Sequence, residues 1–303
     1  MKILIADKDP VSQRKLKDAL EGWGFQVLAE TDGQRVHELL LGTDPPTLAV
    51  LDWTLPELRG AELCRKLSAR GSQGHTYVIM LTENDEPALV AAVMKAGADD
   101  FLCKPVRIDE LELRGRAGKR ICELEQRLRL RATHDALTGI YNRGAIIEIL
   151  QITVSRHKRD HAGVAIIFAD LDHFSRINEE HGQLAGDAVL REVSQRIGYV
   201  LREYDSVGRY GGEELLVVLP TCDARNALEV AERIRLSVCA QPILTPAGPV
   251  SASVSLGVSV LFDETVLRYS ELIQLADQAL HEAKNSGRNQ VVLARSAHAS
   301  ARA

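Results

Sequence analysis

The chain has 303 residues, of which 45% are hydrophobic and 26% are charged. At ~100–200 residues per domain, this length predicts about two globular domains, and the composition argues against wholesale disorder. Lysine and arginine number 37 against 42 aspartate and glutamate residues, so the formal net charge is −5. This balance excludes a nucleic-acid-binding protein that is basic throughout, and an aromatic content of 4% argues against stacking surfaces for single-stranded nucleic acid.

The cysteines are scattered along the sequence and form no CxxC pair. An odd, scattered set of 5 predicts reduced thiols in a cytoplasmic protein instead of disulfides or a zinc site. The apolar run at residues 3–6 is too short for a signal-peptide core, and the sequence has no run of ~20 apolar residues that would span a membrane. We therefore expect neither a membrane nor nucleic acid among its partners.

Residues 1–106 alternate strand-like and helix-like segments. Short apolar runs predict strands at residues 2–6, 26–29, 48–51, 77–81 and 100–102. Amphipathic spacing predicts helices at residues 11–21, 36–41, 61–69 and 87–96. This alternation predicts a doubly wound α/β unit with a parallel sheet covered on both faces, whose ligands bind at the carboxyl ends of the strands.

Residues 107–133 form one long, charged segment with a helical pattern. Ile121, Leu124 and Leu128 follow the spacing of a coiled-coil seam. Two interpretations remain open: a solvated linker helix, or a dimerising helix that joins two modules. Gly115 and Gly118 each cost such a helix ~1 kcal/mol relative to alanine, so they mark a candidate hinge.

Residues 134–294 predict a second α/β unit. Its expected strands are residues 164–168, 205–209, 214–219, 250–260 and 290–293, and its expected helices are residues 186–200, 224–239 and 270–286. The Gly211-Gly212 pair suits a tight hairpin because both residues tolerate positive φ. Residues 295–303 show no pattern, and we expect a disordered tail there.

Polar residues follow the predicted strands of the first unit. Asp7 and Asp9 follow the first strand, Asp52 the third, Thr82 the fourth and Lys104 the fifth. All would gather at one edge of a parallel sheet. A clustered carboxylate can accept a phosphoryl group when a divalent cation and a lysine offset the phosphate charge.

This ordered set resembles the receiver domain of two-component response regulators over residues 1–106. The matching stretches are ILIADKDP, LAVLDWTLPELRG, VIMLTEND and GADDFLCKPV. The resemblance implies a flavodoxin-like fold with Asp52 as the phosphoacceptor and with Thr82 and Lys104 contacting the phosphoryl group. It further implies Mg²⁺ at Asp7, Asp9 and Asp52, and a histidine kinase or phosphotransfer protein as phosphodonor.

Lys8 departs from the receiver pattern, since the family usually has a second, Mg²⁺-ligating acid at this position. An ammonium beside Asp52 would repel a divalent cation and could pair with the carboxylate. We hypothesise that Mg²⁺ binding is weakened, so that phosphorylation is slower or needs Asp9 as a substitute ligand. The alternative is that Lys8 points to solvent, as most lysines do.

A second set of acids lies in the C-terminal half. Asp170 and Asp172 end the strand predicted at residues 164–168, and Glu213 and Glu214 follow the Gly-Gly turn. Carboxylates at a strand end that face others at a hairpin tip suit phosphoryl chemistry, because they hold Mg²⁺ against a triphosphate. Each acid alone is more often a solvated turn residue; the combination carries the inference.

These stretches resemble the GGDEF family of diguanylate cyclases across residues 134–294. The matching segments are DALTGIYNR, FADLDHFSRINEEHGQLAGDAVL, RYGGEEL, VSASVSLGVS and ADQALHEAKNSGRNQ. The resemblance implies an α/β domain with a mainly antiparallel, nucleotidyl-cyclase or palm-like sheet. It also implies that a homodimer joins two GTP molecules, one per subunit, into cyclic di-GMP and pyrophosphate.

The resemblance implies a role for each matching residue. Asp170, the Leu171 carbonyl and Glu213 would bind Mg²⁺ or Mn²⁺, and Glu214 would support the site. The residues implied to contact substrate are Phe174, Asn178, Asp187, Lys284 and Arg288. Asn178 and Asp187 would read the guanine edge, and an aspartate left without its guanine donors would reject ATP.

Four positions depart from the GGDEF pattern. Glu213 stands for the third-position Asp and keeps the carboxylate, while Leu215 replaces a core-facing Phe and so changes packing. Ser175 stands for a phosphate-contacting lysine, which should weaken binding or slow turnover unless Arg176 reaches the phosphates. Gln183 replaces a loop histidine, with a small expected effect.

Arg202 and Asp205 form an RxxD pair just before the signature. Such a pair is by itself a common surface salt bridge of little energetic weight. At this offset the resemblance implies the family's inhibitory site for cyclic di-GMP, with Arg233 as a secondary contact.

We therefore predict a cytoplasmic response regulator with a receiver at residues 1–106, a linker helix at residues 107–133 and a diguanylate cyclase at residues 134–294. Phosphorylation of Asp52 would raise the fraction of productive dimers. One alternative is a catalytically degenerate domain that binds GTP or cyclic di-GMP as a signalling module, which Ser175 and Leu215 favour. Another is an altered cyclase that makes a mixed or adenine dinucleotide, against which Asp187 argues.

Overall fold

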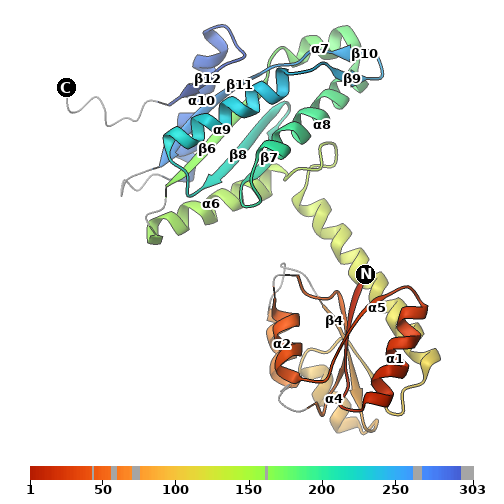
Figure 1. Cartoon of the computed structure of the whole chain (residues 1–303). Helices are drawn as coiled ribbons and strands as arrows, with labels where there is room; N and C mark the ends of the chain where they lie inside the picture. The colour runs from red at the N-terminus through yellow and green to blue at the C-terminus, as the bar shows by residue number, and fades with distance from the viewer. Residues whose placement is uncertain (43, 56–59, 70–75, 161–162, 262–267, 295–303) are drawn as a thin grey trace. The chain divides into compact units, whose positions relative to one another are not determined.

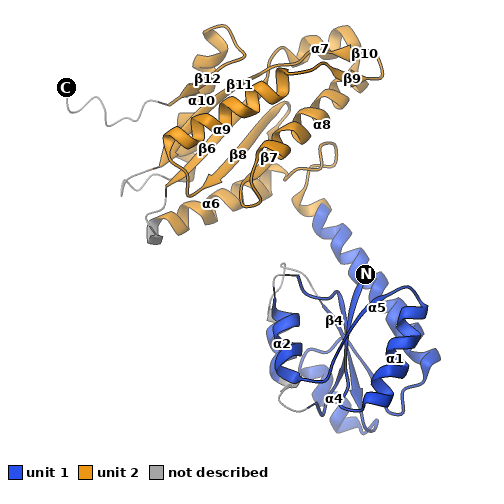
Figure 2. Ribbon diagram, viewed as in Figure 1, with its two compact units in different colours: residues 1–130 blue, residues 131–303 orange. Residues whose placement is uncertain are grey.

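The protein is described by a computed structural model that covers residues 1–42, 44–55, 60–69, 76–160, 163–261 and 268–294 (Figure 1). It divides into two compact units, residues 1–130 and 131–303 (Figure 2). The tail expected at residues 295–303 lies outside the described residues, so its predicted disorder stays a prediction.

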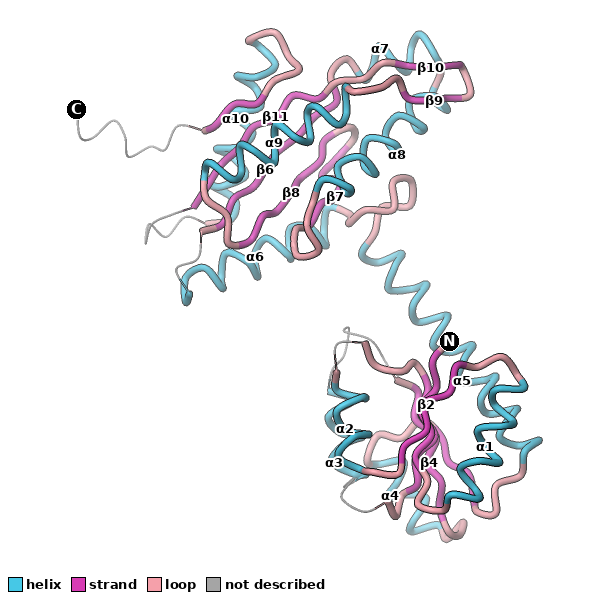
Figure 3. The backbone as a smooth tube through the Cα atoms, viewed as in Figure 1, coloured by secondary structure: helices cyan, strands magenta, loops and turns pink. Residues whose placement is uncertain are grey.

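The first unit contains a parallel sheet with the strand order β2-β1-β3-β4-β5. Figure 3 shows its strands in magenta between the helices. Its strands are β1 (Lys2–Ala6), β2 (Gln26–Glu30), β3 (Leu48–Asp52), β4 (Tyr77–Thr82) and β5 (Asp100–Cys103). Every residue of β3 and β4 is buried, which explains why these strands are continuous apolar runs. The order is that of flavodoxin-like folds, so the doubly wound prediction is confirmed.

Helices cover both faces of this sheet. They are α1 (Pro10–Gly22), α2 (Gly33–Leu41), α3 (Gly60–Ala69), α4 (Pro87–Lys95) and α5 (Ile108–Thr133). Side chains of α1 and α5 pack with one face of the strands, and those of α2, α3 and α4 pack with the other. The strand ends at Asp7, Asp52, Thr82 and Lys104 therefore lie at one edge, as predicted.

Helix α5 packs closely on β4 at Gly118. A Cβ at Gly118 would lie 2.6 Å from Cδ1 of Tyr77 and 3.0 Å from Cδ1 of Leu48. Gly115 is also buried, but a Cβ there would meet no atom within 4 Å. The missing side chain at Gly118 therefore lets the helix approach the sheet, and the hinge stays a prediction.

The coiled-coil seam predicted on α5 is an exposed apolar stripe. Ile121, Leu124 and Leu128 are 40%, 47% and 65% exposed. Their exposure fits a helix that presents this stripe outward, and the dimerising role stays a prediction.

The second unit contains a mixed sheet with the order β12-β11-β6-β8-β7. Its strands are β6 (Val164–Leu171), β7 (Ser206–Gly211), β8 (Glu214–Pro220), β11 (Val254–Leu261) and β12 (Val291–Leu293). Only the β11–β12 pair is parallel among these described strands, which confirms a mainly antiparallel sheet. The strand predicted at residues 250–260 is present as β11, but its predicted start is wrong. Val250 belongs to β10 (Gly248–Val250), which forms a separate hairpin with β9 (Ile243–Thr245).

Helices also cover both faces of the second sheet (Figure 1). They are α6 (Arg143–Asp160), α7 (Phe174–His181), α8 (Gln183–Val200), α9 (Ala224–Cys239) and α10 (Tyr269–Asn285). Helices α8 and α9 pack on one face, and α6 and α10 on the other. Gly257 of β11 lets α10 approach closely, since a Cβ there would lie 2.0 Å from the carbonyl oxygen of Ala276. Among the described helices, none has the length and apolar character needed to cross a membrane.

The contrast between the two glycines of α5 gives a stability prediction. We expect Gly118→Ala to lower the free energy of unfolding of the first unit by ~1–3 kcal/mol, because its methyl group overpacks against Tyr77. Gly115→Ala is the matched control and should raise it by up to ~1 kcal/mol through helix propensity. Both tryptophans, Trp23 and Trp53, lie in this unit, so tryptophan fluorescence during urea unfolding of the whole chain measures it. Equal effects of the two substitutions would contradict the packing role.

Candidate functional site

The first acidic position of the second unit is Asp170, near the end of β6. Asp170 is 5% exposed, and in the sheet register it lies opposite Glu214 of β8 and Ser255 of β11. The Nζ atom of Lys284 lies 2.9 Å from Oδ2 of Asp170. Because Lys284 belongs to the last turn of α10, this helix delivers a cation to the buried strand end.

The turn that carries Glu213 joins β7 to β8. The register shifts between Arg209 and Gly211, and Gly212 has φ +48°, which glycine adopts without a steric penalty. Arg209 Nε donates to the Gly212 carbonyl at 2.8 Å, and Arg209 Nη1 lies 3.2 Å from Oδ1 of Asp135. The segment DALTGIYNR therefore supports this turn. Sequence reasoning missed the supporting roles of Arg209 and Asp135, although both lie in the segments that matched the family.

Like charges accumulate at this end of the sheet. Burial, together with the charges of Glu213 and Asp172, raises the pKa of Asp170 despite the opposing ammonium of Lys284. Burial and the charge of Asp170 also raise the pKa of Glu214. The site therefore carries more negative charge than Lys284 balances, which favours an added cation.

The donor set at this point fits a hard divalent ion. No three acidic, histidine or cysteine side chains gather into a self-sufficient metal site within the described part of the chain. Mg²⁺ is commonly held by one or two carboxylates, with phosphate and water oxygens completing its shell. The carboxylates of Asp170 and Glu213 and the carbonyl of Leu171 suit that pattern.

Asn178 of α7 packs closely against α8. Asn178 Oδ1 is buried and, among the described residues, has no hydrogen-bond partner. A Cβ at Gly186 would lie 1.9 Å from this oxygen and 3.3 Å from Cζ of Phe174, so glycine is required there. Asp187 follows directly on α8. A buried acceptor without a partner calls for a ligand donor, which fits the predicted base-reading role.

The predicted phosphate-binding residues do not share one helix. Lys284 lies within α10, whereas Arg288 lies beyond its end with φ +60°. Ser175 is exposed, and the neighbouring Arg176 pairs with Glu180, with 2.6 Å between Nε and Oε1. Arg176 therefore does not replace the missing lysine in this structure.

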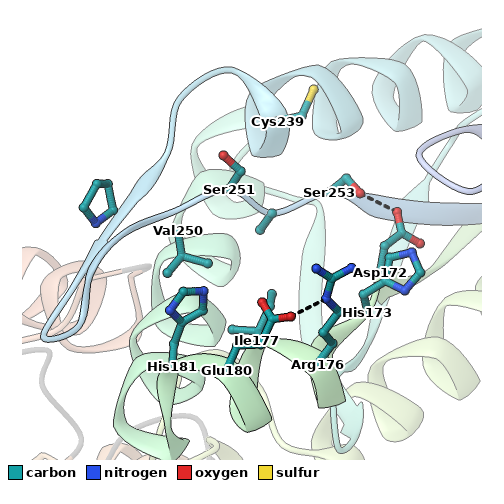
Figure 4. Close-up of a pocket in the computed structure, with 12 residues that line it drawn as sticks. Asp172, His173, Arg176, Ile177, Glu180, His181, Cys239, Val250, Ser251 and Ser253 are labelled. Carbon is teal, nitrogen blue, oxygen red and sulfur yellow. Dashed lines mark hydrogen bonds and ion pairs between the residues drawn. The ribbon is translucent and has the colours of Figure 1, made fainter.

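A cavity of about 410 Å³ lies beside α7 (Figure 4). Asp172, Arg176, His181, Cys239 and Ser253 are among the residues that line it. None of the residues predicted to contact substrate does so. The cavity is therefore separate from the predicted base and phosphate contacts.

The predicted inhibitory pair lies on the surface before β7. Arg202 donates through its backbone N–H to Oδ2 of Asp205 at 2.9 Å and through Nη1 to the hydroxyl of Tyr204 at 2.8 Å. Arg233 of α9 donates to the Val200 carbonyl at 2.8 Å. Burial raises the pKa of Asp205 against the opposing charges of Arg202 and Arg233. The structure thus brings both arginines to the neighbourhood of one carboxylate.

The acidic pocket of the first unit is built around Lys104. Its Nζ lies 2.7 Å from Oδ1 of Asp7 and 2.8 Å from Oδ2 of Asp52, both fully buried residues. Burial raises the pKa of Asp52, but hydrogen bonds from Lys104 and Thr54 outweigh it and hold the pKa below its usual value. Thr82 is buried at the end of β4. Asp52 is thus kept ionised, as a phosphoryl acceptor must be.

Lys8 and Asp9 both make hydrogen bonds to other groups of the protein. Lys8 Nζ donates to Thr54 Oγ1 at 2.8 Å and to Glu83 Oε1 at 3.0 Å. The carboxylate of Asp9 caps α1 by accepting from the N–H groups of Val11 and Ser12. Lys8 is therefore exposed and pairs with Glu83 instead of Asp52, and the ligand role of Asp9 stays a prediction. This donor set fits Mg²⁺ less well than the set at Asp170.

Known proteins resemble both units. The family described as "Diguanylate cyclase, GGDEF domain" matches residues 132–290, more than half of the chain, and "Response regulator receiver domain" matches residues 3–115. Response regulator PleD of Caulobacter vibrioides is 28% identical over 301 residues, covering 96% of this chain and 65% of PleD. Diguanylate cyclase DgcP of Pseudomonas aeruginosa is 36% identical over 166 residues, covering 55% of this chain and 24% of DgcP.

Solved structures of GGDEF domains are similar to the second unit. The coiled coil and GGDEF domain of DgcB from Caulobacter crescentus, in complex with c-di-GMP, gives a TM-score of 0.56 at 26% identity and covers 61% of this chain and 98% of that one. Diguanylate cyclase SiaD from Pseudomonas aeruginosa, in complex with its activator SiaC, gives a TM-score of 0.53 at 33% identity. This match covers 61% of this chain and 71% of the SiaD chain. The chain belongs to the GGDEF family of diguanylate cyclases. It also carries a response regulator receiver domain before the GGDEF domain.

The raised pKa of Glu214 gives a pH prediction. A carboxyl whose folded pKa exceeds its unfolded value destabilises the fold as pH rises through the folded pKa. We expect Glu214→Gln to raise the melting temperature of the GGDEF domain by ~2 °C near neutral pH, with the gain vanishing below about pH 4. The exposed Glu148→Gln is the control. Calorimetry of the whole chain across pH measures both, and a gain that persists in acid would contradict the charge argument.

Proposed function

We propose that the protein is a diguanylate cyclase that condenses two GTP molecules into cyclic di-GMP with release of two pyrophosphates. The 3′-oxygen of each GTP attacks the α-phosphorus of the other, the bond from that phosphorus to the pyrophosphate oxygen breaks, and the 3′-hydroxyl proton passes to a base. The observation that carries this proposal is the buried Asp170 opposite the acidic hairpin, with Lys284 reaching the same strand end.

Asp170, Glu213 and the Leu171 carbonyl would hold Mg²⁺ or Mn²⁺. Such an ion neutralises phosphate charge and makes the 3′-hydroxyl easier to deprotonate. Glu213 is the proposed proton acceptor, and Glu214 supports it from the adjoining strand position. Lys284 and Arg288 would bind the phosphates, as cations do for polyanionic groups.

Asn178 and Asp187 would select guanine. The orphaned oxygen of Asn178 supports this role, because guanine offers N–H donors on the edge that adenine does not. Phe174 lies beside Asn178 and provides an apolar wall. ATP would leave these acceptors unpaired, which argues against the mixed or adenine product.

The receiver would control the reaction. We propose that a histidine kinase or phosphotransfer protein phosphorylates Asp52 in the cytoplasm, where Lys104 and Thr82 contact the phosphoryl group. Because one GGDEF domain presents one such site, two copies must face each other, and a homodimer is required. The phosphorylated receiver would favour that arrangement through α5.

A catalytically degenerate domain is the second candidate. The exposed Ser175, with Arg176 turned to Glu180, leaves one fewer cation for the triphosphate. Such a domain would bind GTP or cyclic di-GMP and signal through contacts alone.

One experiment separates these candidates. We expect purified protein incubated with GTP, ATP and Mg²⁺ to yield cyclic di-GMP by mass spectrometry, and Asp170→Asn to yield none. Bound nucleotide without product would establish the degenerate domain. An adenine-containing dinucleotide would establish altered base selection.

Product inhibition supplies a separate prediction. If Arg202 and Asp205 bind cyclic di-GMP, Arg202→Ala should raise the inhibition constant of the product by ~10-fold or more, because a charged phosphate contact is lost. Initial rates without added product should stay within about twofold of the wild-type rates, since Arg202 is exposed and outside the proposed active site. Titration of pyrophosphate release with cyclic di-GMP measures both values. Unchanged inhibition would refute the site.

A further inference from the structure

The turn between α10 and β12 has an unusual backbone. Gly287, Arg288 and Asn289 have φ values of +113°, +60° and +46°. Two of these residues carry side chains, and non-glycine residues in the left-handed region persist only where the surroundings enforce the conformation. Arg288, a proposed phosphate ligand, therefore sits on a backbone that other residues must hold in place.

Asp172 holds this turn from the sheet side. The Asn289 N–H donates to Oδ2 of Asp172 at 3.0 Å. The same carboxylate accepts from the hydroxyls of Ser253 and Ser255, each at 2.7 Å (Figure 4 shows the Ser253 bond). The residue is 4% exposed, and its bond with Ser255 is fully buried. Asp172 thereby ties the turn to the end of β6 and the beginning of β11.

Arg235 of α9 holds the turn from the other side. Its Nη1 donates to the carbonyl oxygen of Asn289 at 3.3 Å and to the side-chain Oδ1 at 3.0 Å. Glu232 fixes the guanidinium by accepting from Nε at 2.9 Å and from Nη2 at 2.7 Å. Asn289 is thus gripped at its N–H, its carbonyl and its side chain.

The side chain of Arg288 has no such support. It is exposed, and within the described residues its guanidinium makes no hydrogen bond or ion pair. Its backbone N–H donates to the Ala283 carbonyl at 3.1 Å. The position of the guanidinium therefore depends on the backbone of Arg288. That backbone is in turn held by the hydrogen bonds of Asp172 and Arg235 to Asn289.

We propose that Asp172 and Arg235 are positioning residues that hold Arg288 where it binds the substrate phosphates. The inference rests on the proposed function, because it requires a nucleotide bound at Arg288. Neither residue needs to touch that nucleotide. Loss of the hydrogen bonds from either residue would let Arg288 and Asn289 relax toward negative φ, which would move the guanidinium away from the phosphates.

The test uses the whole chain and a GTP analogue with a non-cleavable α,β bridge, with Mg²⁺, and measures the dissociation constant by calorimetry. Arg235→Gln should weaken binding by ~5-fold, in the range of coupled contacts. Arg225→Gln is the matched control, because Arg225 lies on the same helix, is exposed and pairs only with Glu229 among the described residues. It should bind within about twofold of wild type.

Double substitution separates positioning from general damage. If Arg235 acts through Arg288, Arg235→Gln combined with Arg288→Ala should bind no more weakly than Arg288→Ala alone. Additive losses would overturn the proposal, as would wild-type binding by Arg235→Gln. If the wild-type protein did not bind the analogue, the proposed function itself would be contradicted. If Arg288→Ala bound the analogue as tightly as the wild type, only the phosphate-binding role of Arg288, and with it this inference, would be contradicted.

Two further variants keep the test independent of folding. Asn289→Gly in the Arg235→Gln chain should recover part of the lost affinity, because glycine adopts positive φ without strain. Asp172→Asn should bind close to wild type, since its amide oxygen can still accept from the Asn289 N–H, whereas Asp172→Ala should resemble Arg235→Gln. Failure of the glycine rescue, or equal loss in both Asp172 variants, would contradict a positioning role.

Discussion

The proposed chemistry of the GGDEF domain depends on a buried carboxylate at the end of a strand. Asp170 is almost inaccessible to water, and one ammonium, that of Lys284, lies within ion-pairing distance. Burying a charge is costly unless it is paired, and here Glu213 and Glu214 add further negative charge beside it. The fold therefore accepts an unfavourable charge arrangement that a divalent cation would relieve. The folding free energy lost to this charge repulsion would be recovered when a cation binds.

The receiver also buries carboxylates at strand ends, and there a lysine contacts both of them. Asp7 and Asp52 are buried, and Lys104 bridges them at hydrogen-bonding distance from each. Lys8 adds a second ammonium nearby, held by Thr54 and Glu83, where the family usually supplies an acid. Lys104 alone therefore bridges the two buried carboxylates, because the ammonium of Lys8 pairs with Glu83 instead.

Sequence patterns predicted the receiver well because its sheet is buried on both faces, so each strand is a short apolar run between turn residues. The GGDEF domain was harder. Helices α6 and α7 and the β9–β10 hairpin were missed, and β11 was predicted to begin four residues too early, because residues 250–260 alternate as one strand would. Candidate acids could be found from spacing, but tertiary contacts decide their roles. No local pattern shows that Arg209 supports the Gly212 turn, or that Arg288 lies beyond the helix that carries Lys284.

The proposed reaction explains why the chain would be regulated through association. Each GGDEF domain offers one set of base, phosphate and metal ligands, whereas a cyclic dinucleotide needs two nucleotides placed head to tail. The site can therefore be fully formed in one copy and still be unreactive. Control then falls to whatever brings two copies together, and α5 carries the exposed stripe of Ile121, Leu124 and Leu128 on its C-terminal half. A receiver that changed only how often those stripes meet would regulate turnover without altering any residue at Asp170.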